Sequence, residues 1–321
     1  MEMSLSTFFA SILIMACPLV LAALGETITE KAGVVNLSLD GTILLAAMTG
    51  FVTASTTNSL WAGFLAAGLT GCAVAAILGF IGVQLGQSQV AVGFALTFLC
   101  RDLAYFLGTS YASKQGPQLE NMPIPLLSNL PFFGTLFFQH SLVVYCSLLA
   151  IPLCIGFLYH SRQGLILRIA GENPEGCWAR GINPNRIRIF YTVVGGFLVG
   201  VAGGAYSLAI KPGWVHPQGC EGIGWIALAL VIFGTWHPLR VALGAYFFGL
   251  LQLLGIYFQD SFTTVPGQIF QVAPFPLMIF TLLFIHLSQQ RRKTARGKVG
   301  RWLTILTGKP PAWLGRHYHS S

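Results

Sequence analysis

The sequence predicts an all-α, polytopic integral membrane protein, because its composition, its long uncharged runs and the placement of its basic residues agree. Of its 321 residues, 54% are hydrophobic and only 9% are charged, whereas a soluble domain carries about 25% charged residues. Residues 5–25, 61–86, 141–159 and 241–258 contain no Asp, Glu, Lys or Arg. Since a span needs about 20 apolar residues to cross roughly 30 Å of hydrocarbon, such runs in series predict a membrane-spanning helical bundle.

The apolar runs predict about nine transmembrane helices, within a range of about eight to ten. The seventh is short enough to be a half-helix. We expect a single transmembrane domain over residues 1–288 and a basic cytoplasmic tail over residues 289–321. The predicted spans cover residues 5–25, 34–54, 60–84, 88–108, 141–160, 187–210, 222–236, 239–258 and 271–289.

The formal net charge of +8 is concentrated at the end of the chain. The predicted tail carries eight of the 18 basic residues and no acidic residue, so the rest of the chain is neutral. A basic segment directly after a last span is most simply an anchor near anionic lipid. We therefore expect membrane lipids as partners of this tail and no nucleic acid.

Loop charges predict the orientation, because cytoplasmic loops carry an excess of Lys and Arg. The loop 160–190 carries five arginines and is placed in the cytoplasm with the basic tail. The loops 109–140 and 211–221 each carry one lysine and one glutamate, and are placed outside. These assignments alternate across the spans, so the N-terminus is expected outside and the C-terminus in the cytoplasm.

The sequence predicts no catalytic or metal centre. The seven cysteines are scattered without metal or disulfide spacing, and the histidines form no ligand cluster. The segment Gly308-Lys309-Pro310 is not a nucleotide-binding loop, because proline follows the lysine and no glycine stands five residues before Gly308. No basic residue precedes the first span, which favours a retained helix over a cleaved signal.

The cytoplasmic loop holds the strongest local signal. Asn173 followed by Pro174 is typical of a helix start, and Glu175 would lie at the positive end of the helix dipole. Gly181 is a suitable stop, and Asn183-Pro184 repeats the start signal for the next span. The pattern predicts one short helix parallel to the membrane surface, which either receives a push from a soluble motor or simply connects two spans.

This loop resembles that of the branched-chain amino-acid, ribose and nucleoside permease family of ATP-binding-cassette importers, whose usual form is close to GENPxAAxxxGI. Small residues also stand here where the family has alanines. The positions that carry the resemblance are Gly171, Glu172, Asn173, Pro174, Ala179, Gly181 and Ile182.

Two further blocks strengthen the resemblance. Residues 18–45 are similar to the nucleoside-type branch, with Lys31, Ser38 and Asp40 standing for Arg, Gly and Glu. The segment that begins at Gly222 resembles the family's late Gly-x-Gly-x-Ile-Ala block, with His237 in place of Asn. The resemblance runs over residues 5–288.

The resemblance implies a fold similar to the vitamin B12-type importers, in a bacterial inner membrane. It implies a permease subunit that forms the path for a small polar solute, with a nucleoside favoured and a simple sugar second. The expected partners are an ATPase subunit, a second and different permease, and an external substrate-binding protein. No cofactor is expected in this chain, since ATP and Mg²⁺ would be bound by the ATPase. The alternative is an ion-coupled secondary transporter, which would need carboxylates or histidines at the midplane; a membrane enzyme or a channel fits the pattern less well.

The resemblance assigns ATPase coupling to the cytoplasmic loop. Glu172 and Glu175 would face basic residues of the motor, or would only cap the helix. The expected coupling residues are Gly171, Glu172, Asn173, Pro174, Glu175, Arg180 and Gly181.

Carboxylates inside or beside spans suggest a solute path, since they are costly there. Asn36, Asp40 and Gly41 could form a broken-helix element along this path, and Glu221 with Gly222 begins the seventh span in a loosely similar way. The alternative for Asp40 is a hydrated position at the inner interface.

Three further groups are read from spacing. Gly196, Gly200 and Gly204 form a small-residue stripe for helix packing, either within the subunit or at a dimer contact. Arg101 and Asp102 are adjacent in the fourth span, so a direct pair is not expected and both are read as structural. Glu26 and Glu30 lie one turn apart at the inner end of the first span, where they either contact the motor or are hydrated.

Overall fold

The chain is an assembly of α-helices with no β-strand among the residues whose structure is described. The computed structural model describes residues 5–112, 114, 116–125, 127–130, 132–261, 276, 280, 283 and 309–318. The α-helices are α1 (Leu5–Lys31), α2 (Leu39–Thr57), α3 (Leu60–Gly79), α4 (Gln89–Gly108), α5 (Phe133–Phe137), α6 (Leu142–Ile155), α7 (Arg162–Glu172), α8 (Pro174–Trp178), α9 (Pro184–Ala205), α10 (Ile223–Phe233) and α11 (Pro238–Ser261).

Several helices continue in a tighter or wider final turn. The 3-10 turn Thr109–Tyr111 extends α4, and a separate 3-10 turn, Leu127–Asn129, precedes α5. The π-helical turns Phe80–Gln84, Gly156–His160 and Tyr206–Ile210 extend α3, α6 and α9.

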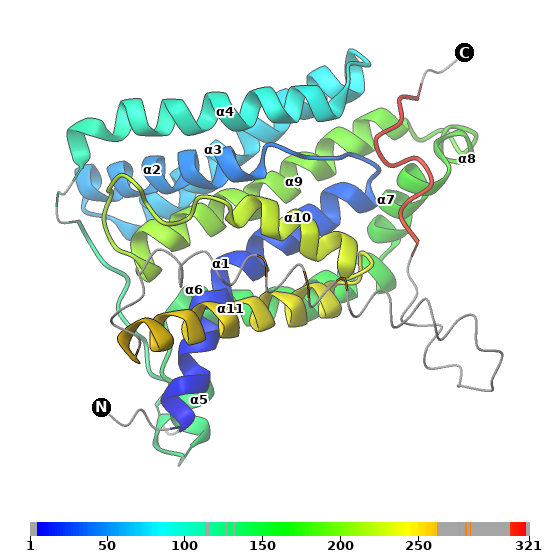
Figure 1. The fold of residues 1–321 in the computed structure, drawn as a ribbon. Helices are drawn as coiled ribbons and strands as arrows, with labels where there is room; N and C mark the ends of the chain where they lie inside the picture. Colours follow the sequence, from blue (N-terminus) through cyan, green and yellow to red (C-terminus); the bar gives the residue numbers. More distant parts are fainter. Residues whose placement is uncertain are drawn as a thin grey trace, which may run out of the picture.

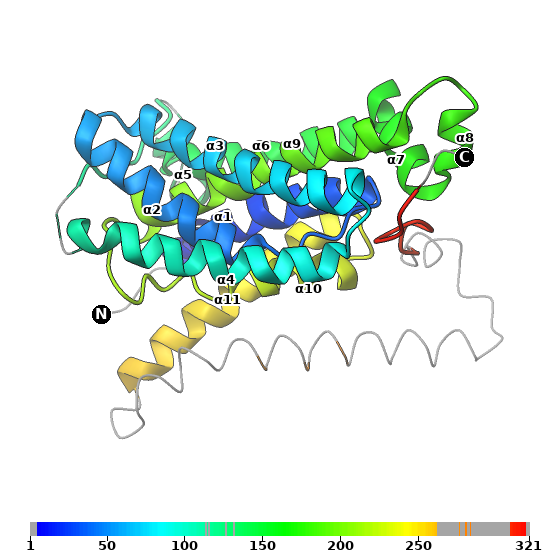
Figure 2. The ribbon, with the colours of Figure 1, turned by 90° about the horizontal axis from the view of Figure 1, so that it is seen from above.

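Seven helical segments in the described part are long and apolar enough to cross a membrane, with mean hydropathy between 1.2 and 2.4. They are formed by α1, α2, α3, α4, α6, α9 and α11 with their extensions. The helices alternate in direction through the bundle, and α7, α8 and residues 309–318 lie at the end opposite the start of α1 (Figures 1 and 2). This arrangement is that of a multi-pass membrane protein.

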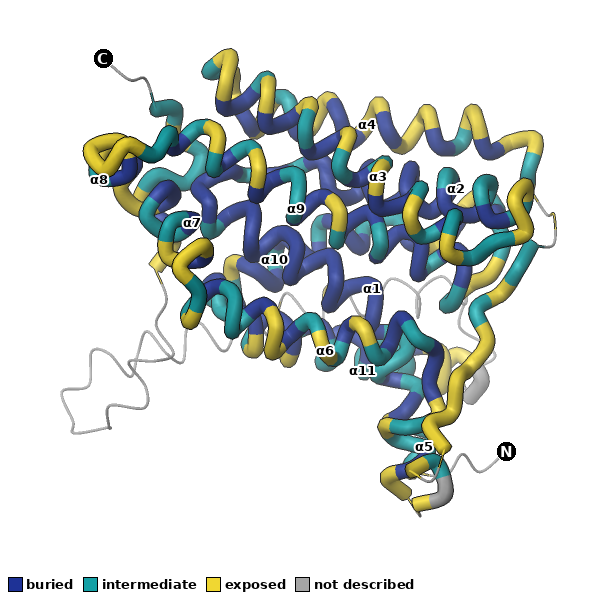
Figure 3. The backbone as a smooth tube through the Cα atoms, turned by 180° about the vertical axis from the view of Figure 1, so that it is seen from behind, coloured by how far each residue is buried: buried dark blue, intermediate teal, exposed yellow. Residues whose placement is uncertain are grey.

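The centre of the bundle is α1, whose residues 16–30 are all buried. It packs against α9, α11, α10 and α6, while α2 and α3 lie beyond α9 and α4 lies at the edge on α2. The tube coloured by burial shows this order, with a buried middle in α1 and an exposed outer face on α4 (Figure 3). A helix that is apolar on every side suits such a central position.

The backbones of α3 and α9 are in direct contact because glycines line their interface. A Cβ atom built on Gly71 would lie 2.0 Å from the carbonyl oxygen of Gly196, and one on Gly200 would lie 2.2 Å from that of Ala67. Gly196 and Gly204 also face α3, against Ala75 and Ala67. The whole glycine stripe therefore packs α9 onto α3 inside this chain.

Among the described residues, the spans depart from the sequence prediction chiefly at the start of the second. The second begins at Leu39 and not at residue 34, because Gly33 has a φ of +92° and the following segment is not helical. The predicted seventh span is the 11-residue α10, the half-helix that its length suggested. The predicted span at residues 271–289 lies almost entirely outside the described residues.

Candidate functional site

The loop between the fifth and sixth predicted spans folds as its capping residues predicted. The Asn173 side-chain oxygen accepts a hydrogen bond from the Gly176 amide at 2.9 Å, and Pro174 occupies the first turn of α8. Gly181 ends this turn with a φ of +76°, a conformation that favours glycine. Asn183 then caps α9 by accepting from the amides of residues 185 and 186. What the sequence did not predict is α7, which makes the loop a pair of helices.

The outer side of α8 is solvent-exposed and carries charge beside one aromatic ring. Glu175 and Arg180 are exposed, and so is 47% of Trp178. The other face is buried through Pro174 and Cys177. The short helix therefore projects from the end of the bundle (Figure 2). Trp178 is its last residue and places an aromatic side chain at this end of the helix.

The base of the loop is held against the end of α1. A Cβ atom on Gly171, next to last in α7, would lie 2.2 Å from the carbonyl oxygen of Lys31, the last residue of α1. Only glycine permits this approach without a shift of the backbone. The helix pair α7–α8 is therefore packed directly on the central helix of the bundle.

Residues 309–318, which we term the C-terminal strap, cross this base (Figure 1). The Trp313 amide donates to the Gly171 carbonyl at 3.0 Å, and the Gly315 amide donates to the Gly33 carbonyl at 3.1 Å. The Ala312 amide donates to the Glu172 carboxylate at 3.1 Å. Glu172, a predicted coupling residue, thus bonds to the strap.

A fully buried arginine joins the strap to α7 and α9. Arg188 donates from Nε to the carbonyl of Ala170 at 3.1 Å and from Nη1 to the carbonyl of Arg316 at 3.0 Å. The first acceptor lies at the end of α7, where the helix dipole is negative and favours a cation. Arg188 therefore connects α9 to α7 and to the C-terminal strap through hydrogen bonds inside the fold.

The expectation for Glu26 and Glu30 is wrong, because both side chains are buried. One oxygen of Glu26 accepts from the Asn36 amide at 3.2 Å, and Glu30 accepts from the indole nitrogen of Trp236. The segment before α2 and the turn before α11 cover this end of α1. Neither glutamate is free to contact a motor or to be hydrated.

Asp40 connects the starts of two helices that are far apart in sequence. Its Oδ1 accepts from the amides of Gly222 at 2.7 Å and Gly224 at 3.1 Å, so it caps α10 from the first turn of α2. A carboxylate is favoured at this positive end of a helix. The two similar sequence elements, at Asp40 and at Glu221, therefore meet in the fold.

The other predicted path residues have local roles that the structure makes visible. The Asn36 side chain accepts from the Ser38 amide at 3.0 Å and from the Ser38 hydroxyl at 2.6 Å, which shapes the turn before α2. Gly41 faces α4, where a Cβ atom would lie 2.2 Å from the carbonyl oxygen of Thr97. Their place along a solute path stays a prediction.

Glu221 is held by several donors at the entrance to α10. It accepts from the hydroxyl of Tyr105 and from the amides of Gln218 at 2.8 Å and Gly219 at 2.6 Å. Burial alone would raise the pKa of Glu221, but these hydrogen bonds together outweigh it and lower the pKa below its usual range. The carboxylate is therefore ionised and fixed in place.

Arg101 and Asp102 do form a pair, contrary to the expectation for adjacent helix residues. The Arg101 Nε and an Asp102 carboxylate oxygen lie 3.7 Å apart, with the side chains 50% and 76% exposed. The helix continues to Tyr111, so Arg101 lies about 18 Å from the first residue of this span and about 15 Å from its last. The pair therefore lies near the middle of the span.

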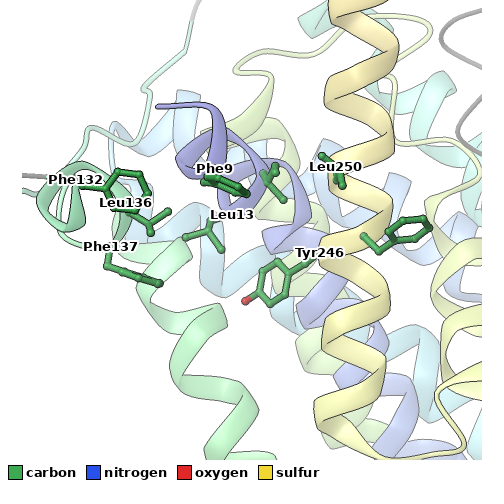
Figure 4. A pocket seen from close by; sticks show the side chains of 9 residues that line it. Phe9, Leu13, Phe132, Leu136, Phe137, Tyr246 and Leu250 are labelled. Carbon is green, nitrogen blue, oxygen red and sulfur yellow. The ribbon is translucent and has the colours of Figure 1, made fainter. Parts of the chain in front are cut away.

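The apolar pocket between α1, α5 and α11 is not a candidate solute site (Figure 4). It has a volume of about 500 Å³ and includes Phe9, Leu13, Phe137 and Leu250 in its lining. Its only side-chain oxygen is that of Tyr246, and it offers no charged group to a polar solute. In the described part of the chain, no group of three or more His, Cys, Asp and Glu could hold a metal ion.

Four functional candidates were missed by sequence reasoning. Trp178 is an aromatic residue in a polar loop, a signal that was present. Tyr105, His216 and Arg188 gave no usable signal, because their importance depends on segments more than 15 residues away that the fold brings together.

Comparison with known proteins decides between the alternatives for the whole chain. Residues 8–285 match the family described as "Branched-chain amino acid transport system / permease component". The chain belongs to this permease family. The match covers the described spans except for the first three residues of α1, and it favours a subunit of an ATP-binding-cassette transporter over the ion-coupled carrier.

The chain is similar to permeases from an archaeon and from bacteria. It is 39% identical over 249 residues to the putative glucose ABC transporter permease protein TsgC13 of Haloferax volcanii, covering 76% of this chain and 75% of the relative. It is 31% identical over 294 residues to the guanosine ABC transporter permease protein NupQ of Bacillus subtilis, covering 87% and 91%. It is 30% identical over 297 residues to the nucleoside ABC transporter permease protein NupC of Lactococcus lactis, covering 88% and 92%. No solved structure matches the chain.

Proposed function

We propose that this permease forms the inner-membrane path for a neutral, hydroxyl-rich solute, a nucleoside or a simple sugar. We further propose that α8 contacts a separate ATPase subunit and transmits its conformational change to the membrane helices. The observation that carries the proposal is α8 itself. It is a capped, exposed helix between two spans, fixed at its base to α1, α9 and the C-terminal strap.

The rigidity of the base supports the coupling role. A force applied to a loop reaches the membrane helices only if the loop does not bend first. Gly171 packs on the end of α1, and Arg188 bonds to the ends of both α7 and the strap. Movement of α8 would therefore be passed directly to the central helix.

The relatives support the solute class. They are named for glucose, guanosine and nucleosides, and these molecules share a ring that carries several hydroxyl groups. A nucleoside remains our first assignment because residues 18–45 resemble the nucleoside-type branch.

The family supports the rest of the assembly. We assign to the complex an ATPase that binds ATP and Mg²⁺, a second and different permease, and an external substrate-binding protein. The α8 end, which carries most loop arginines, faces the cytoplasm, and the N-terminus faces outside. We further assign about nine membrane helices in an arrangement similar to the vitamin B12-type importers.

The assembly is tested by purifying the tagged chain in mild detergent, identifying the subunits that accompany it, and reconstituting them in vesicles. We expect a stoichiometric ATPase, a second permease, and ATP-dependent uptake of guanosine or glucose. A chain that purifies alone and moves solute without ATP would overturn the proposal.

The coupling role is tested by Trp178→Ala, which removes the aromatic tip of α8. We expect uptake and ATP hydrolysis by the complex to fall at least about tenfold, the effect of losing an aromatic anchor at an interface. The matched control is Trp61→Ala, which removes a 72% exposed tryptophan from the first turn of α3, at the opposite end of the bundle. Equal behaviour of the two variants would contradict the assignment of α8.

A further inference from the structure

A polar pocket lies where α4 meets the loop that leads into α10. It has a volume of about 360 Å³ and is lined by Arg101, Asp102, Tyr105, His216, Pro217 and Glu221. Every lining residue except Pro217 offers a polar atom or a charge. This composition contrasts with the apolar pocket between α1, α5 and α11, and the volume falls within the range of small-molecule sites.

The position of this pocket along α4 argues against contact between the pocket and lipid. Arg101 and Asp102 lie near the middle of their span, and both are at least half exposed. Ionised side chains at that depth are costly in hydrocarbon and almost always face a bundle interior or a water-filled cavity. This face of α4 therefore lines water or another subunit.

Folding stability does not explain the charges. An exposed ion pair contributes little to stability, and the separation of 3.7 Å between Arg101 and Asp102 is long for a hydrogen-bonded pair. Neither side chain packs into the core. Their charged groups are available to a molecule that enters the pocket.

The opposite wall of the pocket is held rigidly. The Tyr105 ring lies 3.8 Å from that of His216 and 5.7 Å from that of the buried Trp214, measured between ring centroids. Glu221 accepts from Tyr105, and the next residue, Gly222, donates to Asp40 in α2. The wall is thus anchored to two spans and does not depend on a free loop.

The chemistry of these groups selects a class of ligand. Carboxylates accept hydrogen bonds from hydroxyl groups, a guanidinium donates to ring oxygens, and aromatic faces stack on the apolar side of a sugar or on a base. Asp102 and Glu221 carry two negative charges against the single positive charge of Arg101, so the pocket disfavours anionic solutes such as phosphate esters.

We propose that this pocket is a solute-binding station within the permease, which holds the hydroxyl-rich ring of a neutral nucleoside or sugar during passage. The inference rests on the proposed function, because it names the place where the transported solute touches this chain. Solute selectivity then has a component in the permease itself. Arg101 and Asp102 act in it through their contacts with the solute, and not as structural residues.

The test uses the complete complex in vesicles, with labelled guanosine and labelled glucose as probes. We expect Asp102→Asn to raise the KM for the transported probe at least about tenfold, the factor for losing one charge-assisted hydrogen bond. The matched control is Glu120→Gln, which neutralises an exposed carboxylate in the loop beyond α4 and leaves the KM unchanged.

A second measurement detects the solute at the pocket directly. In His216→Cys, reaction with a membrane-impermeant maleimide should slow at least about tenfold when the transported probe is present. In Glu120→Cys, the same probe should have no effect. The wild-type complex, labelled in parallel, gives the background from native cysteines.

The outcomes separate the two proposals. If the wild-type complex shows no ATP-dependent uptake of either probe, the proposed function fails. If the wild type transports but the KM of Asp102→Asn is unchanged and His216→Cys is not protected, the binding station is overturned. If Asp102→Asn instead loses the second permease during purification, the pocket is a subunit contact, and the inference is likewise overturned.

Discussion

The substitution Arg188→Met tests whether the C-terminal strap is held by the buried arginine. Methionine fills a similar volume but donates no hydrogen bond, so the contacts with the carbonyls of Ala170 and Arg316 are lost. A hydrogen bond from a charged donor contributes about 1.5–3 kcal/mol. The bond to Arg316 is the one that the strap itself loses, so opening of the strap should become roughly 10- to 150-fold more frequent.

The assay is amide hydrogen exchange measured by mass spectrometry on the peptide that contains the strap. The Trp313 and Gly315 amides are protected by bonds to the carbonyls of Gly171 and Gly33, and they exchange only when the strap opens. We expect these two amides to exchange roughly 10- to 150-fold faster in Arg188→Met.

The matched control is Arg186→Met, which removes an exposed arginine half a turn earlier on α9 and should leave exchange unchanged. Unchanged exchange in Arg188→Met, or equal acceleration in both variants, would refute the role of Arg188. Faster exchange throughout the bundle would instead show that the arginine stabilises the whole fold.

Three further predictions concern the bundle. Gly200→Leu should lower Tm in detergent by an amount equivalent to about 1–3 kcal/mol or more, since its Cβ would lie 2.2 Å from the Ala67 carbonyl oxygen; Gly156→Leu, where a Cβ meets nothing within 4 Å, should leave Tm unchanged. Asp40→Asn should reduce uptake several-fold in an intact complex, because a neutral acceptor bonds the start of α10 more weakly than a carboxylate; wild-type uptake would make Asp40 only an interface residue. The lowered pKa of Glu221 stabilises the fold at pH values above the ordinary glutamate pKa of about 4.3, and this contribution disappears as pH falls through the lowered value. Tm should therefore fall more steeply below about pH 4.3 in the wild type than in Glu221→Gln, and parallel curves would contradict this.

Features governed by neighbouring residues were predicted well from the sequence. The starts of α8 and α9 depend on the side chains of Asn173 and Asn183, which accept from amides two or three residues away, and the stop at Gly181 depends on its positive φ. Long apolar runs likewise predicted the spans, because membrane thickness sets their length. These interactions are complete within one segment, so the segment alone reveals them.

Features that depend on distant segments were not predictable. The burial of Glu26 and Glu30 results from the turn before α2 and from Trp236, which is more than 200 residues away. Asp40 likewise bonds to Gly222 and Gly224, which are more than 180 residues away. No periodicity in the first span could indicate which later segment would cover its end.

Only part of the candidate site could be predicted from the sequence. The short helix α8, for which we propose a coupling role, was predicted from its capping residues, but its support by the strap was not. Arg101 and Asp102 were noticed and set aside because adjacent residues point to different helix faces. Their importance depends on Glu221 and His216, which the fold brings to the same pocket.

The contact between α3 and α9 has a consequence for how this permease can move. With carbonyl oxygens about 2 Å from the positions that β-carbons would occupy, neither helix can slide along the other without separating first. The two helices should therefore act as a fixed frame, and the changes of shape in a transport cycle should occur in helices without such a glycine contact, such as α6. Spin labels on α3 and α9 would then provide a constant reference distance in every state, against which displacement of α6 could be measured.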